Sequence, residues 1–246
     1  MQGGIGSVSG GLNSMRTPVD ARSHVYRANR PGPVCEERIL AEFCRPGLRA
    51  LDVGCGAVGR SARKLQRFGA SVYSFDINEQ SVREFAHSPA AGGIRLFVGD
   101  LLHLPFGNGY FDLVLIAVRG LDYFVSRAER TAAILEVDRV LAAGGLFAFN
   151  SANPIGNLLS PRGLHRRAYW RWRRDFLLSR AWRRDSFIDL NGLRLRQTPP
   201  HRVIPEVTEN TGMSLVCMMN RQATSRNLAL LTLFSSAPYY LFRKAS

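Results

Sequence analysis

The feature that most constrains the fold is a short apolar segment that runs directly into a glycine-rich turn. Residues 48–53, LRALDV, have the composition of a buried strand, and glycines follow at Gly54, Gly56 and Gly59. The residues after this turn have a helical pattern. A turn of this kind places a helix N-terminus where it can bind a ligand. The segment predicts an α/β fold, although the G-x-G-x-x-G spacing alone is only a weak sign of dinucleotide binding.

The rest of the chain alternates predicted strands with predicted helices. The expected strands cover residues 71–77, 93–100, 110–118, 146–151, 214–220 and 238–244. The expected helices run from Pro33 to about Cys44, from the glycine turn to about Gly69, from a cap at Asn78, and from a capping box of Ser126 and Glu129 to a stop at Gly144-Gly145. This alternation is typical of a parallel sheet with helices on both faces.

The length and composition fit a single globular domain. The chain has 246 residues, 46% of them apolar and 21% charged, which excludes a disordered chain or a coiled coil as a description of the whole. We expect a flexible Gly/Ser-rich tail at residues 1–22 and one domain over residues 23–246. The longest apolar run, residues 228–242, is interrupted by serines and a proline, so no transmembrane segment is expected. The start lacks the pattern of a signal peptide, which predicts a cytoplasmic protein.

The cysteines point away from metal binding. Cys35, Cys44, Cys55 and Cys217 are scattered without paired spacing. This distribution argues against a zinc site and against a disulfide framework, and it suits a reducing compartment. We therefore predict no metal site.

Three carboxylates end three consecutive predicted strands. Asp52 lies two residues before Gly54, Asp76 ends the second strand, and Asp100 ends the third. In an open α/β sheet, ligands bind at the carboxyl ends of the strands. A carboxylate at position 52 would repel a pyrophosphate, but it suits an ammonium group. S-adenosylmethionine has such a group, and its ribose hydroxyls and adenine amino group suit Asp76 and Asp100.

Several motifs together resemble the class I S-adenosylmethionine-dependent methyltransferases. They are LDVGCG at 51–56, FDIN at 75–78, GDLLHLPF at 99–106, FDLVL at 111–115 and RVLAAGGLF at 139–147. The resemblance covers residues 33–153 and, more loosely, 203–244. It implies a Rossmann-like, mostly parallel sheet of seven strands whose last strand is antiparallel. The extra residue before Gly59 departs from the usual Gly-x-Gly-x-Gly pattern of the family and puts the role of Gly59 in doubt.

The resemblance also implies the cofactor and its contacts. The cofactor is S-adenosylmethionine, and Ile116 or Ala117 is expected beside its methionine end. The expected cofactor-binding residues are Asp52, Gly54, Cys55, Gly56, Asp76, Ile77, Asp100, Leu101, Ile116 and Ala117.

The acceptor side has weaker signals. Asp122 and Tyr123 follow the fourth strand, where small-molecule members of the family present residues to the substrate, and His165 and His201 flank a basic segment. These four are the candidate catalytic residues. We expect Asp122 to orient the acceptor, because an exposed aspartate is a weak base for an alcohol.

Positive charge is concentrated in an insert after the fifth strand. The formal net charge is +14, and residues 155–202 hold twelve arginines, three aspartates and all three tryptophans. We expect this insert to be helical in part and to cover the acceptor. A membrane-surface contact, a nucleic-acid patch and a solvated basic face with its tryptophans in the core are the alternatives.

The sequence therefore predicts a methyltransferase for a small-molecule acceptor, such as a secondary metabolite or a sugar-containing compound. An oxygen acceptor is favoured over nitrogen. An RNA methyltransferase that uses the basic insert is an alternative that is not favoured, since no appended RNA-binding motif is present. A methyltransferase-like binding subunit without turnover is the third hypothesis. The sequence does not indicate the oligomeric state.

Overall fold

The computed structural model describes residues 32–117, 120–159, 170, 174, 186–188 and 194–246. The predicted tail at residues 1–22, His165 and most of the Arg/Trp-rich insert lie outside the described residues. Trp170 and Arg174 are both in helical conformation. Residues 155–159 are helical as well, whereas residues 186–188 and 194–196 form strands. The described part of the insert is therefore helical in part, and the remaining residues do not test the prediction.

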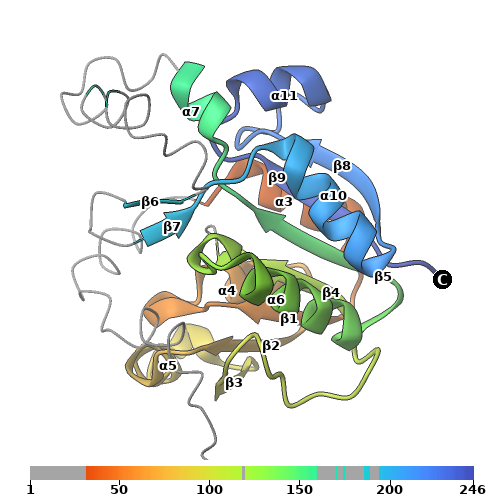
Figure 1. The fold of residues 1–246 in the computed structure, drawn as a ribbon. Coiled ribbons are helices and arrows are strands. Elements are labelled where there is room, and N and C mark those ends of the chain that lie inside the picture. The colour runs from red at the N-terminus through yellow and green to blue at the C-terminus, as the bar shows by residue number, and fades with distance from the viewer. Residues whose placement is uncertain (1–31, 118–119, 160–169, 171–173, 175–185, 189–193) are drawn as a thin grey trace, which may run out of the picture.

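A seven-stranded sheet forms the centre of the molecule (Figure 1). Its strands are β1 (Arg49–Val53), β2 (Ser71–Asp76), β3 (Arg95–Val98), β4 (Phe111–Ile116), β5 (Leu141–Asn150), β8 (Ser214–Met219) and β9 (Tyr239–Arg243). The strand order is β3-β2-β1-β4-β5-β9-β8. Strands β1 to β5 pair in parallel, whereas β9 runs antiparallel to both β5 and β8. The predicted fold, with its antiparallel last strand, is confirmed.

Helices cover both faces of this sheet. Helices α3 (Val34–Phe43), α4 (Arg60–Arg67) and α5 (Glu79–Ala86) cover one face, and α6 (Arg127–Val140) and α10 (Pro200–Thr211) cover the other. One apolar cluster contains Ile134, Val137, Val203, Val207, Phe147 and Phe149. The second contains Ile39, Leu40, Leu65, Phe85, Leu113 and Leu115. Because strand side chains alternate between faces, the two buried faces account for the nearly continuous apolar runs of β4 and β5.

Two predicted helix starts are confirmed, and one predicted stop is wrong. The side chain of Asn78 accepts a hydrogen bond from the Ser81 amide at 3.2 Å. Ser126 caps α6 in the same way. However, α6 ends at Val140 rather than at the two glycines, because the chain already pairs with β4 at the next residue. The glycines lie within β5, where the pairing register shifts and Gly144 has a φ of 71°, so they form a bulge.

Four short elements lie outside the main alternation. They are α7 (Pro154–Leu159), β6 (Ser186–Ile188), β7 (Arg194–Arg196) and α11 (Leu228–Phe234). Strands β6 and β7 form a separate antiparallel pair, which the sequence did not predict. Within the described ranges, no helix has both the length and the apolar character needed to cross a bilayer.

Candidate functional site

The carboxyl ends of β2, β1 and β4 lie side by side and carry the predicted cofactor-binding residues. Val53, at the end of β1, is opposite Phe75 on β2 and opposite Ile116 on β4. Strand β3 extends the same edge beyond β2. The motifs that are separate in the sequence are therefore neighbours in the fold, as the parallel topology requires.

The glycine turn is fixed to β2 by its own backbone. The amides of Gly54 and Cys55 both donate to the carbonyl oxygen of Phe75, at 2.8 and 3.0 Å. Gly54 and Gly56 have left-handed φ values of 82° and 57°, which side chains other than glycine rarely adopt. A Cβ on Gly54 would meet no atom within 4 Å. The turn therefore leaves open space directly above the end of β1.

Gly59 has a packing role instead. It has a φ of 53°, and a Cβ at this position would lie 1.8 Å from the ring of Phe85 on α5. Only glycine allows α4 and α5 to approach this closely. The extra residue before Gly59 therefore shifts this glycine into a helix contact, and its role is structural.

Asp76 organises the next part of the site. Its Oδ2 accepts a hydrogen bond from the Gly56 amide and its Oδ1 accepts one from the Asn78 amide, both at 2.9 Å. The carboxylate thereby joins the glycine turn to the start of α5. Each oxygen of a carboxylate can accept a second hydrogen bond, and Asp76 is only half-buried. Asp76 is therefore able to accept hydrogen bonds from the hydroxyl groups of a ligand at the same time.

Asp52 is fully buried, and one of its oxygens has no partner. Ser74 donates to its Oδ2 at 2.6 Å, whereas Oδ1 accepts no hydrogen bond from any described residue. Burial raises the pKa of Asp52 to about 6, against the opposing effect of the hydroxyls of Ser61 and Ser74. Burying a carboxylate oxygen without a hydrogen bond destabilises the fold unless a ligand donates one. This orphaned oxygen fits the ammonium group of S-adenosylmethionine.

The other predicted contacts differ in exposure. Asp100 is half-buried, and its Oδ1 accepts the amide of Leu102 at 3.0 Å. Leu101, Ile116 and Ala117 are buried and Ile77 is half-buried. Cys55 is buried as well, and burial raises the pKa of its thiol, so this sulfur is not a nucleophile. In the part of the chain that the structure describes, no three metal-ligating side chains come together.

Asp122 is buried in an ion-pair network, so the expected exposed aspartate is wrong. Its Oδ1 lies 3.3 Å from Arg130 Nη1 and accepts the hydroxyl of Ser151 at 2.5 Å. Its Oδ2 accepts the amide of Ala152 at 2.8 Å. Arg130 also binds Glu206 on α10, at 2.9 Å. This network joins the turn after β4 to the end of β5 and to both helices of that face.

The remaining acceptor candidates lie at separate places. Tyr123 is half-buried in the same 3-10 turn, Gly120–Tyr123, as Asp122. His201 is exposed in the first turn of α10. Among the described residues, no hydrogen bond or ion pair joins His201 to Tyr123, and His165 lies outside the described residues.

Gln197 is a residue that sequence reasoning missed. It is 4% exposed, and neither the oxygen nor the nitrogen of its amide has a hydrogen-bond partner among the described residues. The amide of the next residue, Thr198, donates to the carbonyl of Ala152 at 3.0 Å. Gln197 therefore lies beside the segment that leaves β5. No motif surrounds it in the sequence, and only its burial and lack of partners mark it.

A second group that the sequence did not indicate holds α3 in place. Glu36 on α3 is buried and binds Arg60 at 2.6 Å and Lys64 at 3.1 Å on α4, and the hydroxyl of Tyr239 donates to it. Burial alone would raise the pKa of Glu36, but the hydrogen bond and charges of its basic partners outweigh it and lower the pKa. The first turn of α4 is thereby anchored directly after the glycine turn.

Comparison with known proteins agrees with this geometry. Residues 51–149 match the family model described as a methyltransferase domain. The chain is 36% identical over 108 residues to a sterol 24-C-methyltransferase of Gibberella zeae, and this match covers 42% of the chain and 27% of that enzyme. It is 30% identical over 109 residues to a fatty-acid O-methyltransferase of Mycolicibacterium smegmatis, covering 44% of the chain and 38% of that enzyme.

The fold is also found in solved structures. The CcbJ methyltransferase from Streptomyces caelestis superimposes with a TM-score of 0.64 at 16% identity, covering 88% of this chain and 91% of that one. The match in fold therefore covers most of the chain, whereas these two matches in sequence cover less than half of it. The chain matches only 27% and 38% of the length of these two curated relatives.

Proposed function

Since the chain contains a methyltransferase domain of the class I S-adenosylmethionine-dependent type, we propose that the protein transfers a methyl group from this cofactor to an oxygen of a small, largely apolar molecule. The observation that carries the proposal is the edge formed by Asp52, the glycine turn and Asp76. It combines a buried carboxylate oxygen that has no partner among the described residues, open space above Gly54 and a second carboxylate that can accept further hydrogen bonds.

We assign one part of the cofactor to each of the three acids. Asp52 binds the ammonium group, Asp76 accepts the ribose hydroxyls, and Asp100 accepts the adenine amino group. Ile77 and Leu101 flank the adenine ring, and Ile116 and Ala117 form the wall beside the methionine end. Gly54, Cys55 and Gly56 supply the close backbone approach. Since the acids lie on a rigid sheet edge, they hold the ligand in one orientation.

The bound cofactor supplies an electrophilic methyl group on a sulfonium. The protein then has to align the acceptor oxygen in line with this methyl group and exclude water, and alignment supplies much of the acceleration. The buried residues at the end of β4 exclude water from one side. Tyr123 lies in the 3-10 turn after β4, Gly120–Tyr123, and is our candidate for the acceptor contact.

Asp122 acts through its neighbours rather than on the acceptor. Its two oxygens are occupied by Arg130, Ser151 and Ala152, so it positions the turn that carries Tyr123. The amide of Gln197 has no hydrogen-bond partner among the described residues, so it offers a donor nitrogen and an acceptor oxygen. We assign it to a hydrogen bond with the polar end of the acceptor. His165 and His201 stay as candidate bases.

The nature of the acceptor rests on the relatives. Their names specify a sterol and a fatty acid, both of which are largely apolar. The sterol enzyme is named for methylation at carbon and the fatty-acid enzyme for methylation at oxygen, and we follow the second for the acceptor atom. A site with a few polar groups and mostly apolar walls binds molecules of this kind. We therefore favour a lipid-like acceptor over a sugar-containing one.

The replacement Asp76→Ala tests the cofactor assignment. Each charge-assisted hydrogen bond lost to the ribose should weaken S-adenosylmethionine binding by about 1.5–3 kcal/mol, as measured by calorimetry. Asp112→Ala removes an exposed acid of β4 that pairs with Arg49 and should leave the affinity unchanged. Equal affinities of Asp76→Ala and the wild type would reject the placement of the ribose. Tighter binding of NAD than of S-adenosylmethionine would overturn the assignment of the cofactor.

A further inference from the structure

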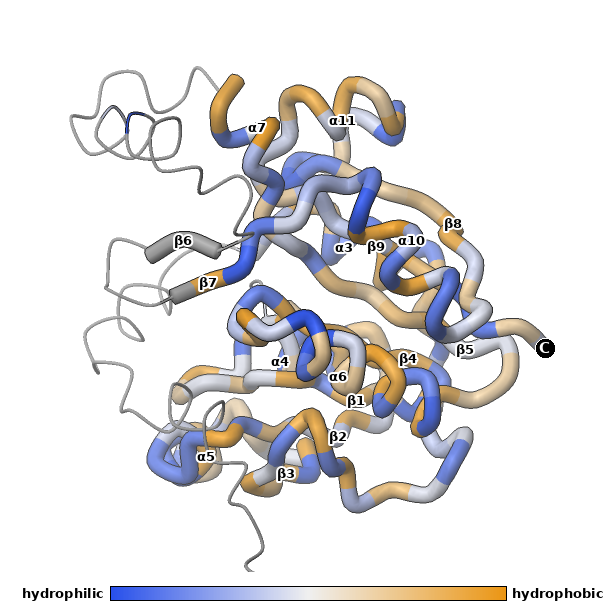
Figure 2. The backbone as a smooth tube through the Cα atoms, in the orientation of Figure 1, coloured by the Kyte–Doolittle hydropathy of each residue, from blue (hydrophilic) through white to orange (hydrophobic). Residues whose placement is uncertain are grey.

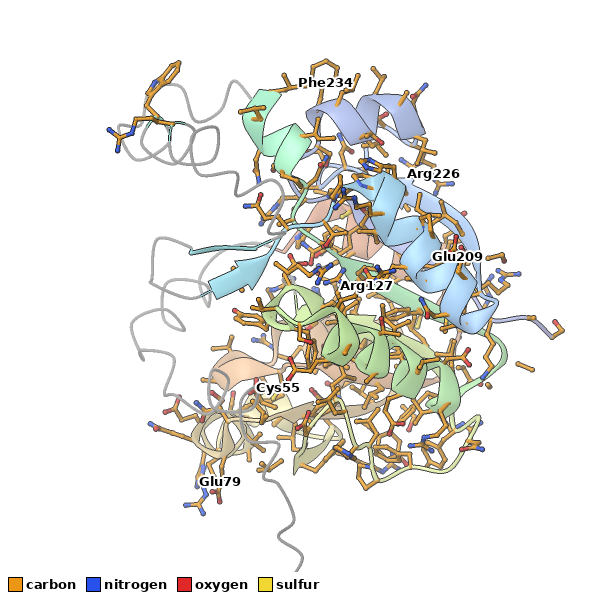
Figure 3. The ribbon with its side chains drawn as sticks, viewed as in Figure 1. Cys55, Glu79, Arg127, Glu209, Arg226 and Phe234 are labelled. Carbon is orange, nitrogen blue, oxygen red and sulfur yellow. The ribbon has the colours of Figure 1, made fainter. Side chains whose placement is uncertain are left out.

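An unusually apolar surface lies on the two short helices α7 and α11. Helix α11 has seven residues, LALLTLF, none of them charged, and only Leu231 among them is buried. Large apolar side chains of the two helices are between 42% and 59% exposed: Leu159, Leu228, Leu230, Leu233 and Phe234. We call these five residues the α7–α11 face. Figure 2 shows hydrophobic segments in orange on both helices, and Figure 3 shows Phe234 at the outer end of the molecule.

This face lies at the same edge of the sheet as the candidate site. Helix α7 follows the carboxyl end of β5, and α11 precedes β9, whose first residue, Tyr239, is opposite Asn150 at the end of β5. Asn153 joins the two helices, because its Nδ2 donates to the carbonyls of Thr232 at 2.8 Å and Ser235 at 2.9 Å. The two helices are therefore held together beyond the strand ends (Figure 1).

The exposure is not explained by the fold of the described chain. Apolar side chains scattered singly over a surface are ordinary, but a contiguous group at one end of a molecule marks a binding surface. In α11 the buried side is limited to Leu231, so the helix contributes little to the core. The helix is hydrophobic on nearly all sides, and a helix of this kind is normally buried rather than exposed to water.

The charge of the chain indicates what covers this face. The net charge is +14, and residues 155–202, which begin within α7, carry a surplus of nine positive charges. An apolar face continuous in sequence with a cationic segment fits an anionic lipid bilayer, in which the apolar side chains enter the acyl boundary and basic residues bind phosphates. A second copy fits less well. Helices of six and seven residues fall short of the roughly 20–30 residues that a stable interface uses on each side, and two strongly cationic chains repel each other.

We propose that the α7–α11 face docks the protein on the surface of an anionic bilayer, with the leucines and Phe234 in the acyl boundary. The docked face places the carboxyl edge of the sheet next to the membrane, so an apolar acceptor reaches the site without crossing water. The docking is a property of the surface alone and does not require methyl transfer. If the proposed function holds, a lipid-like acceptor would enter the site from the docked membrane.

Vesicle binding of the full chain tests this proposal. The probes are vesicles of phosphatidylcholine alone and of phosphatidylcholine with phosphatidylserine in a 4:1 ratio, with co-sedimentation as the readout. We expect the wild type to bind the anionic vesicles at least tenfold more tightly than the neutral ones. The double variant Leu230→Ser/Phe234→Ser should lose at least tenfold in affinity for the anionic vesicles. The matched control is Leu135→Ser/Val216→Ser, which removes two side chains of α6 and β8 that are 45% and 38% exposed and should bind as the wild type does.

Three results would overturn the proposal. The first is equal vesicle binding by the wild type and the α11 variant, including no binding by either. The second is a wild-type dimer in gel filtration that the α11 variant converts to a monomer, which would make a second copy the occupant. The third is a melting temperature of the α11 variant far below that of the control variant, which would show that the chain itself covers the face. S-adenosylmethionine affinity should be equal in all these proteins, so a failure of cofactor binding is recognised separately.

Discussion

The two halves of the sheet edge are built in different ways. The cofactor half, at β1, β2 and β3, takes its acids from residues 52–100, and most of its hydrogen bonds connect a turn to the adjacent strand. The acceptor half, at β4, β5 and β9, is held by Arg130, whose partner Glu206 is 76 residues away. The cofactor half is therefore specified by local motifs, whereas the acceptor half depends on packing between distant segments.

This difference separates two kinds of functional residue. Asp52 and Asp76 leave part of their hydrogen-bonding capacity unused and so remain available to a ligand. Asp122, in contrast, has both oxygens occupied by the protein. Residues of the same type are thus assigned to a ligand in one half, whereas in the other half they stabilise the fold.

Removing Arg130 should have the largest effect of the changes considered, because it leaves two carboxylates buried without their cation. Arg130→Met is expected to lower the free energy of unfolding by about 3–5 kcal/mol, measured by urea denaturation. Arg127→Met, an exposed position on the same helix, should change it by less than about 0.5 kcal/mol. A loss below about 1 kcal/mol in Arg130→Met would mean that the acceptor half does not depend on this network.

The protonation of Asp52 should control cofactor affinity. Because the free protein has a pKa of about 6 at this carboxyl and a bound ammonium favours the ionised form, binding releases a proton below pH 6. The affinity for S-adenosylmethionine should then fall by about tenfold for each pH unit below 6. Calorimetry between pH 5 and 7.5 measures this affinity. Asp52→Asn should bind S-adenosylmethionine more weakly, with an affinity that does not change over this pH range. A wild-type affinity that stays constant from pH 5 to 7.5 would place the ammonium group elsewhere.

The same pKa has the opposite effect on the stability of the ligand-free protein. A folded-state pKa above the ordinary value means that the unfolded chain ionises first as the pH rises. The contribution of Asp52 to stability is therefore present below about pH 4 and is lost as the pH rises through 6.

The open space above Gly54 can be tested with a matched glycine. Gly54 and Gly47 have nearly equal φ values, 82° and 81°, and neither Cβ would meet an atom within 4 Å. Gly54→Ala and Gly47→Ala should therefore lose similar stability, about 1–2 kcal/mol. Only Gly54→Ala should weaken S-adenosylmethionine binding, by about tenfold, because its methyl group occupies space needed by the ligand. Equal cofactor affinities of the two variants would show that no ligand approaches this turn.

The smallest effect is expected at Gln197, on the acceptor side. Gln197→Leu removes two buried polar groups that have no partner among the described residues, so the melting temperature should stay the same or rise. Loss of one neutral hydrogen bond to the acceptor should raise its KM by about two- to tenfold. An unstable variant would show that the amide serves the fold rather than the acceptor.

The sequence predicted the local structure of the cofactor half well because its signals are local, whereas the contacts with the cofactor stay a prediction. The strand ends, the glycine turn and the cap at Asn78 all depend on residues near one another in the chain, and the structure reproduces them. The acceptor half could not be predicted in the same way. The burial of Asp122 depends on Ser151, 29 residues away, and no local pattern distinguishes a buried aspartate from an exposed one.

Two differences between the predicted and the observed secondary structure have the same origin. The glycines at 144–145 have the local pattern of a helix stop, but pairing with β4 converts the chain to a strand before they are reached. Helix α11 was visible only as part of an apolar run, since its boundaries are set by a cap at Asn227 and by β9. In both cases the competing contact comes from a distant strand.

The most direct test of the account is the independence of the two halves with respect to the cofactor. Calorimetric titration of S-adenosylmethionine at pH 7.5 into the wild type, Asp52→Asn and Gln197→Leu measures it in one series. We expect an affinity loss of at least tenfold in Asp52→Asn and wild-type affinity in Gln197→Leu. Equal losses in the two variants, or no loss in Asp52→Asn, would contradict the assignment of the cofactor to the β1–β3 half of the edge.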